Sequence, residues 1–267
     1  MPINHHSHTT CLLGAAAGDV IGSPYEFIGK KTEDFPLFQK MSMATDDTIL
    51  TAAVAEAILT GRDYGACIRE FALAFPGRGY GGMFRMWIHS KDPKPYNSFG
   101  NGSAMRVSAV GWAFDTLEDV LAQAEASAAP THNHPEGIKG AQATALAVWM
   151  ARQGADKESM RLEIGARFGY DLSGTVESIR PGYKFYETCQ KTVPQALVAF
   201  FDSASFEDAI RKTVSLGGDA DTLGAITGAV AEAFYGGVPA GIAAEVWPLL
   251  PEGVAAVLRR FAERYNA

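Results

Sequence analysis

Apolar residues recur along this chain every three or four positions, which is the period of an α-helix that buries one face. Between residues 46 and 59 the apolar stripe contains Ile49, Leu50 and Ala53, and Gly61 follows as a stop signal. The same period predicts further helices over residues 117–128, 138–150, 158–168, 205–214, 223–235 and 252–265. The pattern therefore predicts a chain built mainly of amphipathic helices.

Signals for β-strands are almost absent. Only residues 193–201 are ambiguous, and we assign them to a helix. Alanine is the most frequent residue, and it favours helices over strands. Gly224 and Gly228 lie inside a predicted helix, where small residues let a second helix approach closely. Without an internal repeat or a linker in the sequence, we expect one all-α domain over residues 1–267, with roughly ten or more short helices.

Composition and charge narrow the class of protein. The 267 residues are 47% hydrophobic and 20% charged, as in an ordinary globular protein, and the formal net charge of −7 disfavours binding of nucleic acid. The three cysteines are too widely spaced for a disulfide framework or a zinc site. No apolar run is long enough for a membrane helix, and no signal sequence is evident. We expect a cytoplasmic protein, and nothing in the sequence requires more than a monomer.

Two acidic clusters begin predicted helices. Each combines two carboxylates with a hydroxyl, and the residues are Thr45, Asp46 and Asp47 in the first cluster and Asp219, Asp221 and Thr222 in the second. Helix capping is the ordinary explanation for a single such cluster, because side-chain oxygens satisfy the free amides of a first turn. Capping, however, requires only one oxygen at each helix.

The charges of these clusters favour a metal site. Two carboxylates about 4 Å apart repel by about 4 kcal/mol at an effective dielectric constant of about 20, whereas a helix dipole offsets only ~0.3–1 kcal/mol per charge. If the two helix N-termini converge, a cation must lie between them. Ligation by oxygen alone selects Mg²⁺, Mn²⁺ or Ca²⁺.

Three other segments carry candidate chemistry. Pro24 ends a small-residue helix and places Glu26 on a loop, either as an exposed charge or as a carboxyl group beside a site. A glycine-rich turn precedes a short helical segment, and its free amides suit either an ordinary capped turn or a phosphate; its residues are Gly100, Asn101, Gly102, Ser103 and Met105. His132 and His134 lack further zinc ligands, so we expect them to bind a polar ligand or cap a loop.

Two glycine-rich or histidine-rich segments are given no such role. Residues 77–82 superficially resemble a dinucleotide-binding loop, but no predicted strand precedes them, so we reject a Rossmann fold. His5, His6 and His8 are interpreted as part of a mobile tail.

Taken together and in this order, the motifs resemble the ADP-ribosylglycohydrolase family, from Gly14 to Gly236. The resemblance implies an all-α orthogonal bundle with a centre of two Mg²⁺ or Mn²⁺ ions where helix N-termini converge. It assigns one half of the metal site to Thr45, Asp46 and Asp47, and the other half to Asp219, Asp221 and Thr222. It also implies that substrate is bound by Gly100, Asn101, Gly102, Ser103, Met105, His132 and Gly218.

The expected reaction is metal-dependent hydrolysis of the glycosidic bond between ADP-ribose and an acceptor. The favoured acceptor is a protein side chain, and a small-molecule conjugate is the alternative. Asp46 or Asp47 would accept the proton of the attacking water, and Glu26 would close the pocket, bind an ion or transfer a proton. Competing interpretations are a non-catalytic ADP-ribose binder, a structural protein of the same fold and a metal phosphoesterase. Residues 168–194 match no known pattern, which leaves the acceptor side of the pocket open. Mg²⁺ and Mn²⁺ take the same ligands and the same octahedral geometry, so the choice between them is also open.

Overall fold

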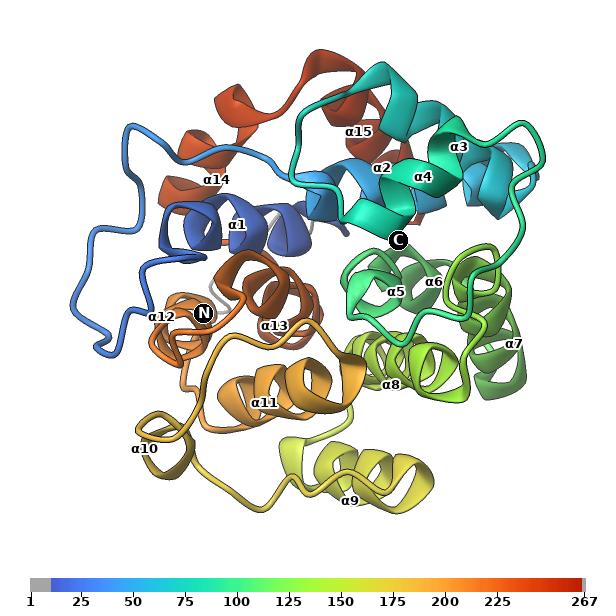
Figure 1. Cartoon of the computed structure of the whole chain (residues 1–267). Helices are drawn as coiled ribbons and strands as arrows, with labels where there is room; N and C mark the ends of the chain where they lie inside the picture. Colours follow the sequence, from blue (N-terminus) through green and yellow to red (C-terminus); the bar gives the residue numbers. More distant parts are fainter. Residues whose placement is uncertain (1–10, 266–267) are drawn as a thin grey trace, which may run out of the picture.

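The computed structural model describes residues 11–265, and its regular secondary structure there is entirely helical (Figure 1). The first half contains α1 (Leu13–Gly22), the 3₁₀ helix η1 (Ser23–Tyr25), α2 (Asp46–Thr60), α3 (Tyr64–Ala74), α4 (Gly82–His89), α5 (Gly102–Met105), α6 (Ser108–Ala113) and α7 (Leu117–Ala128). The second half contains α8 (Pro135–Arg152), α9 (Lys157–Phe168), α10 (Val176–Ile179), α11 (Cys189–Phe201), α12 (Phe206–Val214), α13 (Ala220–Tyr235), α14 (Ala240–Val246), η2 (Trp247–Leu249) and α15 (Glu252–Tyr265). The all-α prediction is confirmed.

The predicted helices are present, with small shifts at their ends. α8 begins at Pro135, three residues before its predicted start, because His134 accepts a hydrogen bond from the Glu136 amide and proline suits the first helical turn. The ambiguous segment 193–201 belongs to α11, which begins earlier, at Cys189. α3 was not predicted; it begins after Asp63, whose carboxylate accepts a hydrogen bond from the Ala66 amide.

α1 and α13 form the centre of the molecule and run antiparallel in close contact (Figure 1). All ten residues of α1 are buried. Gly18 lies so near α13 that an added Cβ atom would lie 1.9 Å from the Gly224 carbonyl oxygen, and one added at Gly14 would lie 2.3 Å from the Gly228 carbonyl oxygen. Only glycine permits this approach of two backbones. As a result, the C-terminal half of α1 lies beside the first turn of α13.

Asp19 of α1 fixes the start of α2. Its carboxylate accepts hydrogen bonds from the amides of Thr45 and Thr48, at 2.9 and 3.1 Å, and from the hydroxyl groups of both threonines. Two of the amides at the N-terminus of α2 are thus satisfied by a side chain of another helix. Three helix segments that are distant in the sequence therefore meet at one point.

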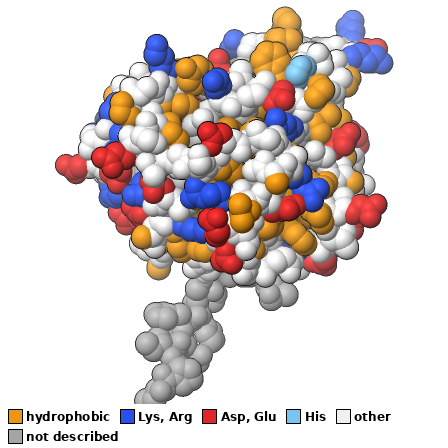
Figure 2. All heavy atoms as spheres, turned by 90° about the horizontal axis from the view of Figure 1, so that it is seen from below, with side chains coloured by type: hydrophobic (Ala, Val, Ile, Leu, Met, Phe, Trp, Pro, Cys, Tyr) orange, Lys and Arg blue, Asp and Glu red, His pale blue; other side chains and the backbone are white. Residues whose placement is uncertain are grey.

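The outer surface carries charges of both signs. Figure 2 shows one face on which acidic and basic side chains are interspersed among apolar ones. That face carries no continuous basic patch on which a nucleic-acid backbone could lie. Within residues 11–265, no helix is both long and apolar enough to cross a membrane.

Candidate active site

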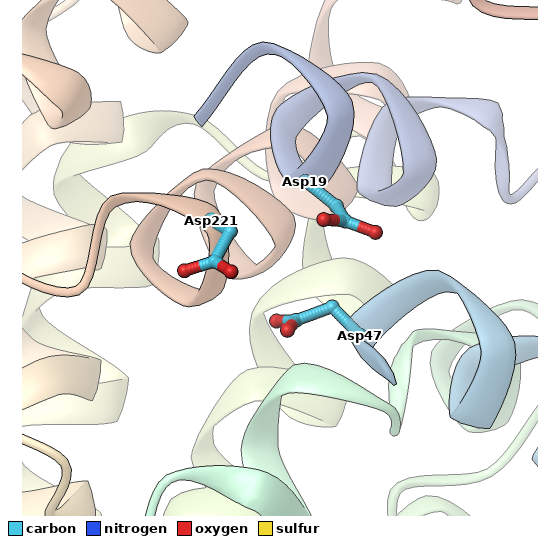
Figure 3. A group of neighbouring side chains, drawn as sticks. All are labelled: Asp19, Asp47 and Asp221. Carbon is cyan, nitrogen blue, oxygen red and sulfur yellow. The ribbon is translucent and has the colours of Figure 1, made fainter. Parts of the chain in front are cut away.

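Carboxylates from α1, α2 and α13 point toward one another at the meeting point of these helices (Figure 3). One oxygen each from Asp19, Asp47 and Asp221 lies within 4.8 Å of the other two. A second group with the same spacing contains Glu26, Asp219 and Asp221. Because Asp221 belongs to both groups, the structure has two adjacent places where a cation could be held.

Burial and mutual repulsion dominate the electrostatics of this carboxylate cluster. Asp47 and Asp221 are 2% and 5% exposed, and burial together with neighbouring negative charges raises the pKa of both well above the ordinary value. Burial raises the pKa of Asp19 and of Asp219 to about 6, although hydrogen bonds oppose the shift. Glu26 is half-buried, and its pKa rises to about 8 through burial and the charge of Asp221.

A buried oxygen of Asp47 shows that the cluster fits a metal ion. Asp47 Oδ1 is buried without a hydrogen-bond partner among the described residues, which is costly for a carboxylate. All candidate ligands here are oxygen atoms, the donor set that hard divalent cations prefer. An ion would satisfy this oxygen and neutralise the carboxylates around it.

The other residues of the two acidic clusters lie around these carboxylates. Asp46 lines the same cavity as Asp47, and its amide donates to the Arg78 carbonyl oxygen at 2.7 Å. The Thr45 hydroxyl lies 2.7 Å from Asp19 Oδ1 and 3.1 Å from Asp47 Oδ2, so it lies behind the carboxylates. Thr222 lines the cavity. The two acidic helix starts therefore converge as the sequence predicted.

A cavity of about 370 Å³ extends from the carboxylates to the glycine-rich turn. Asn101 connects the glycine-rich turn to the carboxylates, because its Nδ2 donates to Asp219 Oδ2 at 2.7 Å. The turn is held by hydrogen bonds to the chain before α11, from the Asn101 amide to the Glu187 carbonyl oxygen (2.8 Å) and from the Cys189 amide to the Phe99 carbonyl oxygen (3.0 Å). Predicted substrate-binding residues that line the cavity are Gly100, Asn101, Gly102, Met105 and His132.

Two residues predicted to bind substrate do not line this cavity. The Ser103 side chain is buried and donates to the Gly137 carbonyl oxygen at 2.7 Å. Gly218 packs against Tyr183, since an added Cβ would lie 2.5 Å from Tyr183 Cε1. His134 caps α8, one of the two roles expected for it. His5, His6 and His8 lie outside the described residues.

Several residues of the site were not identified from the sequence. Asp19 is the only charged residue of α1, and a charge inside a wholly apolar helix was the signal that could have identified it. Glu187, which also lines the cavity, comes from the segment 168–194 that matched no pattern. Gly79 lines the cavity beside Asp46. It belongs to residues 77–82, which no strand precedes in the described chain.

Proteins of one family are similar to this chain in sequence and in fold. A family model described as ADP-ribosylglycohydrolase matches residues 5–266. ADP-ribosylhydrolase ARH3 of Mus musculus is 26% identical over 306 aligned positions, which cover 85% of this chain and 83% of the relative. An ADP-ribosyl dinitrogen reductase glycohydrolase of Rhodospirillum rubrum is 27% identical over 263 positions, covering 88% of this chain and 87% of the relative.

A solved structure, described as an ADP-ribosylglycohydrolase-related protein complex, superposes with a TM-score of 0.72. It is 27% identical, and the match covers 96% of this chain and 97% of that one. The family match supports hydrolysis of an ADP-ribose linkage as the reaction, and acidic clusters of the kind described above could hold the metal. The extent of these matches shows that the chain belongs to the ADP-ribosylglycohydrolase family.

Proposed function

We propose that this protein hydrolyses, with bound divalent metal ions, the glycosidic bond that joins ADP-ribose to a protein side chain. One observation carries the proposal: carboxylates from three helices converge at one end of a cavity whose other end is a glycine-rich turn. A diphosphate needs backbone amides or cations, whereas the anomeric carbon of a leaving ribose needs nearby negative charge. The cavity offers both environments.

The proposed metal ligands are the oxygen-bearing side chains of the carboxylate cluster. Two Mg²⁺ or Mn²⁺ ions would be held by Thr45, Asp46, Asp47, Asp219, Asp221 and Thr222. Asp19 lies beside them, but both of its oxygens already accept hydrogen bonds from Thr45 and Thr48. When bound, such ions supply Lewis acidity and lower the pKa of water at the site. Asp47 Oδ1 is buried without a hydrogen-bond partner among the described residues, so this atom gains most from a bound ion.

The protein's own residues would carry the proton transfers. The bond from the anomeric carbon to the acceptor atom breaks, and a water oxygen forms a new bond to that carbon. Asp46 or Asp47 accepts the proton of the water, and Glu26 donates a proton to the departing acceptor atom. Glu26 lines the same cavity as Asp46 and Asp47, as this donor role requires. The remaining carboxylates stabilise the positive charge that develops on the ribose.

The glycine-rich turn would bind the other end of the substrate. Gly100 and Gly102 both line the cavity, but the Gly100 amide already donates to Ser98 Oγ at 3.1 Å, so of these two amides the Gly102 amide is the candidate contact for a diphosphate. Asn101 holds the turn against Asp219, so the spacing between diphosphate and metal ligands is fixed by a direct hydrogen bond. The turn therefore sets which bond of the ligand reaches the carboxylates.

The test is release of ADP-ribose from proteins modified on arginine, serine or glutamate, measured with Mg²⁺, with Mn²⁺ and with EDTA. We expect EDTA to abolish release and either ion to restore it. Asp221→Asn should lower kcat by about 100-fold, because it removes a ligand shared by both carboxylate groups. Asp92→Asn, an exposed carboxylate outside the cavity, is the control.

Three outcomes would contradict the proposal. Activity that survives EDTA, or survives the double change Asp219→Ala and Asp221→Ala, would exclude metal-dependent catalysis at this cluster. Binding of ADP-ribose without cleavage of any linkage would indicate a non-catalytic binder. Release of phosphate or AMP in place of ADP-ribose would indicate a phosphoesterase.

A further inference from the structure

Arg106 is an unusual buried charge at the base of the cavity. It directly follows α5, it is 0% exposed, and no other lysine or arginine lines the cavity within the described part of the chain. Its Nη2 donates to the Ser127 carbonyl oxygen at 3.1 Å and to Thr131 Oγ1 at 2.8 Å. Burial lowers its pKa to about 10, so the guanidinium remains charged at neutral pH.

Thr131 connects this guanidinium to His132. Thr131 Oγ1 and His132 Nδ1 are 2.7 Å apart. A guanidinium can only donate, so Thr131 Oγ1 is the acceptor toward Arg106. Among the hydrogen-bond partners of the Thr131 hydroxyl within residues 11–265, only His132 Nδ1 can accept its proton. Nδ1 therefore accepts, and the imidazole proton lies on Nε2.

The surroundings of His132 keep the ring neutral and direct Nε2 at the glycine-rich turn. The ring is 5% exposed, and burial together with the charge of Arg106 holds its pKa well below the ordinary value. Cβ atoms added at Gly102 and Gly100 would lie 3.1 and 3.5 Å from Nε2. Glycine at both positions leaves the space beside Nε2 free for a ligand atom.

We infer that Arg106 and Thr131 are positioning residues that fix His132 as an Nε2–H donor, aimed at a non-esterified phosphate oxygen of the bound ligand. This inference rests on the proposed function for the identity of the ligand. A phosphate oxygen carries no proton at this site, so it requires a donor; the opposite tautomer would present a lone pair to it and repel it. The hydrogen bonds from Arg106 through Thr131 to His132 thus present a donor, and not a lone pair, to the ligand at the glycine-rich turn.

The tautomer can be measured directly, without turnover. Long-range ¹H–¹⁵N spectra of protein labelled with ¹⁵N-histidine distinguish a protonated from an unprotonated ring nitrogen, and the signals lost in His132→Gln identify His132. We expect a protonated Nε2 and an unprotonated Nδ1 in the wild type and in Thr131→Ser. Thr131→Val removes the hydroxyl and should populate both tautomers. Thr144→Val is the matched control, because the Thr144 hydroxyl is equally buried but has no hydrogen-bond partner among the described residues.

Ligand affinity provides the second readout. Calorimetry with ADP-ribose should show Kd rising about twofold in Thr131→Val, because the ligand must then select one of two populated tautomers, and unchanged in Thr144→Val. A wild-type spectrum with the proton on Nδ1, or a Thr131→Val spectrum identical to the wild type, would overturn the inference. If Thr131→Val does not fold, the wild-type spectrum decides. If hydrolysis is absent while the tautomer is as expected, only the proposed reaction fails.

Discussion

At the scale of single residues, the site is organised by charges that the protein alone does not neutralise. Asp47, Asp219 and Asp221 are all nearly buried, and the pKa of each is raised by burial or by its neighbours. Without a cation, ionisation of these carboxyl groups opposes folding, since each charge is desolvated and faces others of the same sign. These charges therefore lower the stability of the metal-free protein, and a bound cation would remove that cost.

Asp47→Asn tests whether the buried charges destabilise the metal-free protein and whether Asp47 binds a metal ion. The amide keeps the shape of the side chain but removes one charge from the cluster, so the metal-free protein should be more stable by about 1–3 kcal/mol at pH 8. Its affinity for Mg²⁺ should fall by about tenfold or more, because one oxygen ligand becomes a weaker donor. Urea unfolding in EDTA and calorimetric titration with Mg²⁺ measure the two effects. A loss of stability together with unchanged Mg²⁺ affinity would show that Asp47 has only a structural role.

Most of the cavity residues that the sequence indicated lie in patterned groups, and the isolated charges Asp19 and Arg106 were missed. The two acidic clusters and the glycine-rich turn each repeat a chemical type over a few positions, so their patterns are visible without a structure. Asp19 and Arg106 are single charges inside apolar segments. Their roles depend on Thr48 and Thr131, which are 29 and 25 residues away, and such pairings arise only from folding.

At the scale of elements, the contact between α1 and α13 positions the carboxylate cluster. Gly14, Gly18 and Gly22 are spaced by four residues and face Gly228, Gly224 and Ala220 in reverse order. The sequence indicated that Gly224 and Gly228 could allow close helix packing, but it did not show which helix is their partner. The short distance brings Asp19 and Asp221 from the two helices into one group.

Gly18→Ala should therefore be strongly destabilising. An added methyl group would lie 1.9 Å from the Gly224 carbonyl oxygen, which is backbone and cannot rotate away, so the helices must separate. We expect a loss of about 3 kcal/mol in urea unfolding and a marked loss of Mg²⁺ affinity. Gly241→Ala, in α14 with nothing within 4 Å of the added atom, is the control and should gain about 0.5–1 kcal/mol. Equal stability of Gly18→Ala and the wild type would contradict the packing described for α1 and α13.

At the scale of the whole molecule, the helical period predicted the class of fold and most of the long helices, because their apolar faces are set by local sequence. Short helices such as α10 (four residues) fell below what periodicity can detect. The packing order around α1 and α13 depends on contacts between distant segments and could not be derived from one sequence. The same distant contacts create the cavity, so the place of Glu187 in its lining was also not predictable.

The stability of the metal-free molecule should fall as pH rises, and bound metal should remove this loss. In the metal-free folded protein, the pKa values of Asp19 and Asp219 are raised to about 6 and that of Glu26 to about 8, whereas the unfolded chain has ordinary values near about 4. The folded state therefore holds more protons than the unfolded state between about pH 4 and about pH 8, and stability falls as pH rises through this window, by about 1.4 kcal/mol per pH unit for each net proton. His132, with its lowered pKa, acts in the opposite direction below its ordinary value.

Thermal unfolding in EDTA from pH 5 to pH 8.5, compared between the wild type and the double variant Asp219→Asn and Asp221→Asn, isolates the carboxylate contribution. The wild type should lose more stability than the variant as pH rises, because only the wild type retains the full set of opposed charges. Saturating Mg²⁺ should remove this loss in the wild type alone, since the ion binds the deprotonated carboxylates of the folded state. If both proteins respond equally to pH in EDTA, the carboxylate cluster is not the source of the dependence, and the electrostatic argument for a cation at this site fails with it.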